Sequence, residues 1–145
     1  GDTSTGGLAR LDWAVGPDTD ALILELGSND ALRGIEPEVT RANLDAILQK
    51  MSERGVKVLI AGMLAPPNMG DDYAADFNGI FADLSEKYEA PLYPFFLDGV
   101  AAERHLNLPD GMHPTEEGVS IIVERILPLV EQLIDGPSEE TAAIN

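Results

Sequence analysis

Three short apolar runs stand out along the chain. They are Ala21–Leu26, Val56–Met63 and Pro91–Phe96. A loop containing Gly, Pro or Asp follows each run. Strands of a parallel sheet are buried on both faces and therefore show a nearly continuous apolar pattern. The pattern predicts three strands of a parallel sheet.

Between and around these runs, apolar residues recur at the spacing of a helix. This spacing predicts helices over Leu8–Val15, Glu36–Arg54, Asp71–Tyr88 and Thr115–Ile134. We expect the last helix to be kinked or broken at Pro128, and Trp13 to lie in the core. Strands that alternate with helices predict an α/β fold with helices on both faces of the sheet. Residues 1–134 are predicted to form this domain, and 135–145 a flexible polar tail.

The chain is strongly acidic, with a formal net charge of -17 over 145 residues. Nucleic acids and anionic membrane surfaces bind clusters of Lys and Arg, so this charge argues against both as partners. The chain contains no cysteine, which excludes disulfides, thiolate chemistry and cysteine-based metal sites. No apolar run is long enough for stable membrane insertion.

The stretch LGSNDALRG follows the first predicted strand. Loops at the carboxyl ends of parallel strands carry the function of such sheets. Gly27 allows a tight exit from the strand, and Asn29 offers a side-chain amide just beyond it. An amide fixed at this point is suited to an oxyanion hole. The alternative is an ordinary turn, because Gly, Ser, Asn and Asp all favour turns.

The stretch LPDGMHPTEEG precedes the last predicted helix. Asp110 and His113 lie three residues apart, so the carboxylate can turn back onto the imidazole Nδ1–H and leave Nε2 free as a general base. Pro114 is expected at the first helical position, where it fixes the exit from the loop. The alternative is that Asp110 and His113 are capping residues of the helix.

The sequence gives little support for a metal site or for a nucleotide-binding site. His105 and His113, with Asp110 between them, lack the regular ligand spacing of a zinc site. His105 is predicted to be a solvated surface residue, and Asp71 and Asp72 to be the acidic first turn of a helix. The opening GDTSTGG lacks the lysine and the glycine pattern of a phosphate-binding loop. No cofactor and no metal are expected.

Taken in order, GDTSTGGLARL, ELGSNDALRG and DGMHP resemble the SGNH, or GDSL, hydrolases. The likeness is nearest to the bacterial arylesterase, thioesterase I and lysophospholipase group, and it covers Gly1 to about Val130. The resemblance implies a three-layer α/β/α, flavodoxin-like fold. It also implies a serine ester hydrolase that acts on short- to medium-chain acyl esters or thioesters.

The resemblance also implies roles for individual residues. Asp110 and His113 match the family's Asp-x-x-His block and become the catalytic acid–base pair. Asn29 matches the oxyanion asparagine. The neighbouring Ser28 and Asp30 are expected to contact substrate.

The opening Gly-Asp-Thr-Ser resembles the family's second block more than its nucleophile block. Gly1 then supplies an oxyanion N–H, and neither Thr3 nor Ser4 is the nucleophile. A nucleophile block follows an apolar strand, and no such strand precedes Gly1. We therefore expect the first two strands of the family's sheet, and the serine, to lie upstream of residue 1.

A sheet without those strands leaves an unpaired edge, so this chain alone is expected to be unstable and inactive. An N-terminal segment or a second chain would complete it. The loop after the second strand, with Met63, Leu64, Ala65 and Pro66, is the expected wall of the acyl pocket; the alternative is a Pro-rich connector.

Two other functions stay open on the sequence. One is a non-catalytic SGNH scaffold that binds acyl groups or carbohydrate. The other is a flavodoxin-like nucleotide or flavin binder, which the missing phosphate loop disfavours. Because family members are often exported, we expect a periplasmic or secreted protein.

Overall fold

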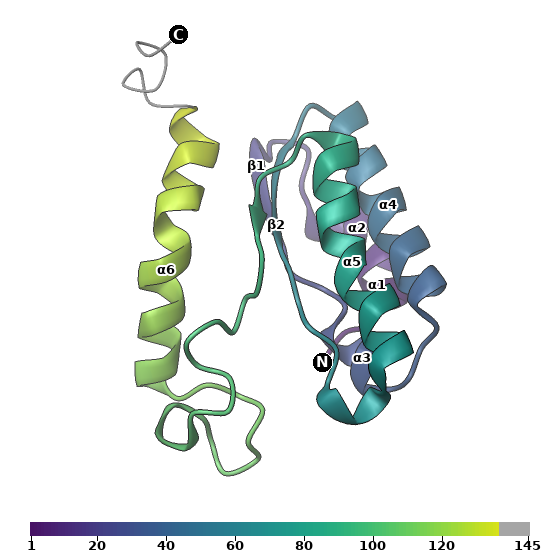
Figure 1. Ribbon diagram of the computed structural model, residues 1–145. Coiled ribbons are helices and arrows are strands. Elements are labelled where there is room, and N and C mark those ends of the chain that lie inside the picture. The colour runs from purple at the N-terminus through teal and green to yellow at the C-terminus, as the bar shows by residue number, and fades with distance from the viewer. Residues whose placement is uncertain (137–145) are drawn as a thin grey trace, which may run out of the picture.

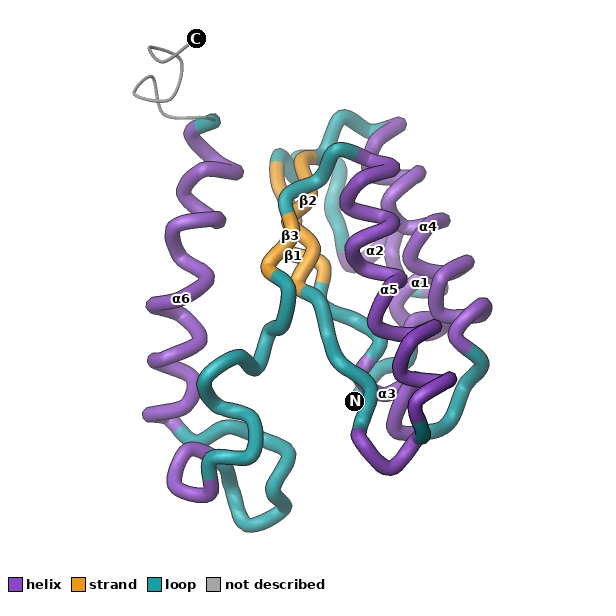
Figure 2. The backbone as a smooth tube through the Cα atoms, viewed as in Figure 1, coloured by secondary structure: helices purple, strands orange, loops and turns teal. Residues whose placement is uncertain are grey.

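The structure is a computed structural model that describes residues 1–136; the rest of the predicted tail, residues 137–145, lies outside the described residues. Helices alternate with three parallel strands (Figures 1 and 2). In chain order the elements are α1 (Ser4–Ala9), α2 (Leu11–Ala14), β1 (Ala21–Leu24), α3 (Ser28–Leu32), α4 (Pro37–Glu53), β2 (Lys57–Ala61), η1 (Pro67–Met69), α5 (Asp71–Tyr88), β3 (Leu92–Tyr93), η2 (Arg104–Leu106) and α6 (Glu116–Asp135).

The sheet has the order β1-β2-β3, and both strand pairs are parallel, as the apolar runs predicted. The strands are shorter than the runs. The shortest, β3, pairs only with Ile60 and Ala61 of β2. Pro91 and Pro94 stand on either side of β3 and have no N–H to donate to a ladder, which limits this strand to two residues.

Helices cover the two faces of the sheet unequally. Figure 1 shows α1 to α5 on one side and α6 alone on the other. Side chains alternate along β2, so that Val58 and Ile60 pack toward α4 and α5, whereas Leu59 and Ala61 pack toward α6. The result is the expected three-layer α/β/α arrangement.

The first predicted helix is in fact two short helices, α1 and α2. Trp13 on α2 is 77% exposed, so the prediction that it lies in the core was wrong. The stretch after β1 was expected to be a loop, but α3 begins at Ser28, directly after Gly27.

The last helix, α6, runs without a break from Glu116 to Asp135 and contains Pro128, so the predicted break is absent. Thr115 is its N-cap, and its hydroxyl accepts a hydrogen bond from the N–H of Gly118 at 3.2 Å. Pro114 therefore precedes the cap and does not occupy the first helical position.

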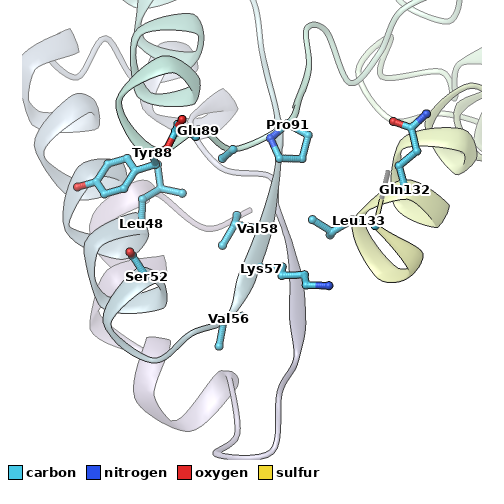
Figure 3. Close-up of a pocket in the computed structure, with 12 residues that line it drawn as sticks. Leu48, Ser52, Val56, Lys57, Val58, Tyr88, Glu89, Pro91, Gln132 and Leu133 are labelled. Atoms are coloured by element: carbon cyan, nitrogen blue, oxygen red, sulfur yellow. The ribbon is translucent and has the colours of Figure 1, made fainter. Parts of the chain in front are cut away.

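A cavity of about 510 Å³ lies at the amino ends of the strands, where β3 no longer accompanies β2. Val58, Pro91 and Leu133 are among the residues that line it (Figure 3). Function in parallel α/β sheets sits at the opposite, carboxyl end of the strands, so we assign this cavity no part in catalysis. Among the described residues, no helix is long and apolar enough to cross a membrane.

Candidate active site

The candidate site lies at the carboxyl edge of the sheet. The chain's N-terminal residues, α3 and the long loop before α6 all reach this end of the molecule (Figure 1). These segments contain the predicted residues Gly1, Asn29, Asp110 and His113. The topology therefore brings residues more than 80 positions apart to one edge.

Asp110 and His113 form the contact that their spacing predicted. The Nδ1 of His113 lies 2.6 Å from a carboxylate oxygen of Asp110. The other carboxylate oxygen accepts hydrogen bonds from the backbone N–H groups of Met112 at 2.9 Å and His113 at 3.0 Å. A carboxylate on Nδ1 fixes the imidazole tautomer and leaves Nε2 as the basic nitrogen.

These donors also set the charge state of Asp110. The backbone N–H of His113, followed by its imidazole and the N–H of Met112, lowers the pKa of Asp110 from 3.8 to about 2. The carboxylate is therefore ionised at neutral pH and can stabilise an imidazolium. The side chain of His113 is 71% exposed, so its free nitrogen can reach an incoming group.

The loop that carries this pair is tied to the fold at its base. The N–H of Leu108 donates to the carbonyl of His113 at 2.7 Å, which closes the turn. The side-chain amide of Asn107 donates to the carbonyl of Val100 at 2.7 Å. A Cβ on Gly118 would lie 2.4 Å from the carbonyl oxygen of Leu106, so glycine lets α6 pack directly on the loop.

Gly1 lies beside the side chain of Asn29. A Cβ on Gly1 would lie 3.0 Å from the side-chain oxygen of Asn29. Both residues, with Ser28 and Gly27, line a hollow of about 290 Å³. Ser28 is half-buried on its wall, where a bound group can touch it. Gly1 and Asn29 therefore line the same hollow, and their use as oxyanion donors stays a prediction.

Gly27 makes the sharp exit from β1 possible. Its φ is +117°, which favours glycine. A Cβ at this position would also lie 3.3 Å from Phe81 and 3.4 Å from Phe77. Two independent requirements therefore favour glycine at position 27, two residues before Asn29.

Asp30 was expected to contact substrate, but it lies in the interior of the protein. It is fully buried, and its carboxylate accepts hydrogen bonds from Ser4 and Thr40. A carboxylate enclosed in this way is closed to substrate, so we correct its expected role from substrate contact to internal support. Ser4 is also fully buried, which agrees with its exclusion as the nucleophile.

The expected acyl-pocket wall is only partly at the surface. Met63 is buried in the core, and the N–H of Ala65 donates to the side chain of Asn78 at 2.8 Å. Leu64 is 47% exposed, and Pro66 is half-buried. Within this loop Leu64 offers the apolar surface, whereas Met63 belongs to the core and cannot line a pocket.

The comparison with known families decides the identity. The sequence pattern of the GDSL-like lipase/acylhydrolase family matches residues 1–121, which include Gly1, Asn29, Asp110 and His113. The chain belongs to this family. The SGNH-type resemblance of the three sequence blocks is thereby confirmed.

Named members of the GDSL family that resemble this chain are ester hydrolases. Esterase TesA of Pseudomonas aeruginosa is 37% identical over 92% of this chain and 67% of its own length. Thioesterase 1/protease 1/lysophospholipase L1 of Escherichia coli K12 is 32% identical over 95% of this chain and 67% of its own length. The chain thus spans about two thirds of the length of these relatives.

A solved structure supports the same GDSL fold. The psychrotrophic esterase EstA of Pseudoalteromonas sp., inhibited by monoethylphosphonate, matches with a TM-score of 0.86 and 28% identity. The match covers 93% of this chain and 74% of EstA. The expected α/β SGNH fold is therefore confirmed.

Two supporting residues of this GDSL domain escaped the sequence analysis. Thr40 bonds Asp30 from the core-facing side of α4, and Gly118 allows the close approach of α6. A polar residue in helical register with buried Leu44 was an available signal for Thr40. No local signal distinguishes Gly118 from a solvent-facing helix glycine.

Proposed function

We propose that this protein is a serine ester hydrolase of the esterase, thioesterase or lysophospholipase type. It acts on short- to medium-chain acyl esters through an acyl-enzyme intermediate. The observation that carries this proposal is the Asp110–His113 contact at 2.6 Å, made through Nδ1 of an exposed imidazole side chain. That arrangement is the acid–base half of a Ser-His-Asp triad.

The proposed reaction has two acyl-transfer steps. As a serine Oγ attacks the ester carbonyl, Nε2 of His113 takes its proton, and Asp110 stabilises the imidazolium. The Gly1 N–H and the Asn29 amide donate to the oxyanion. His113 then protonates the leaving oxygen or sulfur, and water repeats the sequence on the acyl-enzyme to release the acid and regenerate the serine.

We place the nucleophilic serine on a segment upstream of residue 1. Asp110 is the side-chain partner of His113 among the described residues, and no serine hydroxyl there bonds the imidazole. Ser4 is enclosed around Asp30. The likeness of Gly1–Ser4 to the second GDSL block, and not to the nucleophile block, supports this proposal.

Unpartnered apolar surface supports the same proposal. The free edge of β1 carries Ile23, which is 44% exposed. On α6, the side chains of Val119, Val123 and Leu127 form a stripe four residues apart, each about half exposed. A strand beside β1 and a helix beside α6 would cover both features.

The proposed substrate is a small acyl ester or thioester, whose acyl chain lies against apolar surface such as Leu64. We further propose that the reaction takes place in the periplasm or outside the cell. A non-catalytic scaffold that only binds acyl groups or carbohydrate is the competing function. The intact Asp110–His113 pair favours catalysis, because pure binding does not need an oriented general base.

A fluorophosphonate probe tests the proposal. Protein isolated from its native cells is treated with the probe, denatured and weighed by mass spectrometry, beside a sample whose His113 is replaced by alanine. We expect one adduct on a serine outside residues 1–145, lost in H113A. An adduct on Ser28, or no adduct on a protein that still binds acyl ligands, would overturn the proposed mechanism.

A further inference from the structure

Asp30 is an unusual residue to find at full burial. Among the described residues no Lys, Arg or His forms an ion pair with it. An enclosed carboxylate is costly unless hydrogen bonds replace its water. Asp30 has three such bonds: from the Ser4 N–H at 2.8 Å, the Ser4 hydroxyl at 2.5 Å and the Thr40 hydroxyl at 2.7 Å.

These bonds join three separate elements. Ser4 begins α1, Asp30 lies in α3, and Thr40 lies in α4. The side chain of Asn43, also on α4, donates to the Ser4 hydroxyl at 2.9 Å and extends the network. The carboxylate is therefore the common acceptor that holds the N-terminal segment and α3 against α4.

The network lies directly behind the two oxyanion donors. Asp30 follows Asn29 in the first turn of α3, and Ser4 is three residues from Gly1. A Cβ on Gly1 would lie 3.0 Å from the side-chain oxygen of Asn29, and both residues line the same hollow. We therefore expect a change in the distance between Ser4 and Asp30 to change the separation of Gly1 and Asn29.

We propose that Asp30 is a positioning residue, which sets the separation of the Gly1 N–H and the Asn29 amide in the oxyanion hole. This inference rests on the proposed hydrolase function. Oxyanion donors act only when they are held where the negative charge develops. Buried supports behind such donors determine how much of their effect is realised.

The first test replaces Asp30 by its neutral isostere. In the serine-bearing protein, D30N keeps one acceptor for the Ser4 N–H but turns an NH₂ toward the two hydroxyls. We expect kcat per phosphonate-titrated site to fall about tenfold, or about 1.4 kcal/mol, with KM within about twofold. Titration excludes unfolded molecules from the rate. A matched control is D45N, which removes a surface carboxylate that binds Lys87 and Tyr88 away from the site.

A double-mutant cycle separates positioning from general weakening. If Asp30 acts through Asn29, then D30N should change kcat by less than about threefold in an N29A background. If the losses in kcat caused by D30N and N29A multiply in full in the double variant, the inference is wrong. It is also wrong if D30N keeps the parental kcat. Should D30N fail to fold, T40V removes one donor with little change in shape, and we expect about a threefold loss in the same direction.

An NMR measurement tests the role of Asp30 independently of the proposed hydrolase function. The side-chain amide of Asn29 gives its own NMR signal, which does not require turnover. We expect D30N to shift or broaden this signal and D45N to leave it in place. A parent that neither reacts with phosphonate nor hydrolyses esters sinks the hydrolase proposal, whereas an unmoved Asn29 signal in D30N sinks the role of Asp30.

Discussion

Two aspartates at the carboxyl edge of the sheet each accept three hydrogen bonds, in opposite ways. The donors to Asp30 come from residues 26 and 10 positions away, and its side chain is fully buried. The donors to Asp110 come from residues two and three positions away, and its side chain is 40% exposed. One carboxylate joins distant segments, and the other closes its own turn.

This difference suits Asp30 to a structural role and Asp110 to a chemical one. A carboxylate enclosed by distant donors stabilises the arrangement around it but is out of reach of substrate. A carboxylate bound within its own turn adds little to the fold but keeps an imidazole oriented in water. The segments that carry Gly1 and Asn29 are thus joined by a buried carboxylate, whereas the turn of Asp110 and His113 is closed by hydrogen bonds within itself.

The largest expected effect comes from removing the imidazole of His113, which tests the catalytic side of this comparison. In the serine-bearing protein we expect H113A to lower kcat by roughly 10⁵-fold, because triad members act as a unit. The control is H105A, the same change at a histidine that is 68% exposed on the surface. Ester hydrolysis rates decide the matter; equal losses in both variants would remove His113 from the mechanism.

The second test makes the same substitution at both aspartates and measures stability. We expect D30A to lower the free energy of unfolding by about 3 kcal/mol, since it leaves buried donors without an acceptor. D110A should change it far less, because the donors there can bond water. Urea unfolding gives both values. Similar losses at the two positions would show that burial does not separate them.

A third pair of variants tests whether the packing of α6 on the loop of Asp110 and His113 stabilises the fold. The G118A variant places a methyl group 2.4 Å from the carbonyl oxygen of Leu106, so we expect a loss of about 1–3 kcal/mol. The G79A variant adds the same methyl group inside α5, where no atom beyond the neighbouring helix backbone lies within 4 Å, and should gain about 0.5–1 kcal/mol. Thermal unfolding of both proteins checks the signs. A stabilised G118A would mean that α6 does not rest on the loop.

The same contrast explains what the sequence could predict. The Asp110–His113 contact follows from a three-residue spacing, so the pattern alone contained it. The parallel sheet followed from continuous apolar runs, although the prolines beside β3 shortened one strand more than the run suggested. The position of Asp30 depends on Ser4 and Thr40. No local pattern relates residues on different elements, and Asp30 was therefore misassigned to substrate contact.

The pH dependence of Asp110 gives the smallest expected effect. Its pKa is about 2 in the folded protein against an ordinary 3.8, so its contribution to stability is present above pH 3.8 and is lost as the pH falls through 2. We therefore expect the stability difference between the protein and D110N to be constant near pH 5 and to vanish toward pH 2.

The cause of that shift can be divided by a further variant. The backbone N–H of His113 is the largest contributor to the low pKa of Asp110, ahead of the imidazole. H113A removes the ring but keeps both backbone donors. An NMR titration of the Asp110 carboxyl carbon should therefore show a midpoint that rises only part of the way from about 2 toward 3.8. A full return to the ordinary value would mean that the ring, and not the turn, holds the carboxylate.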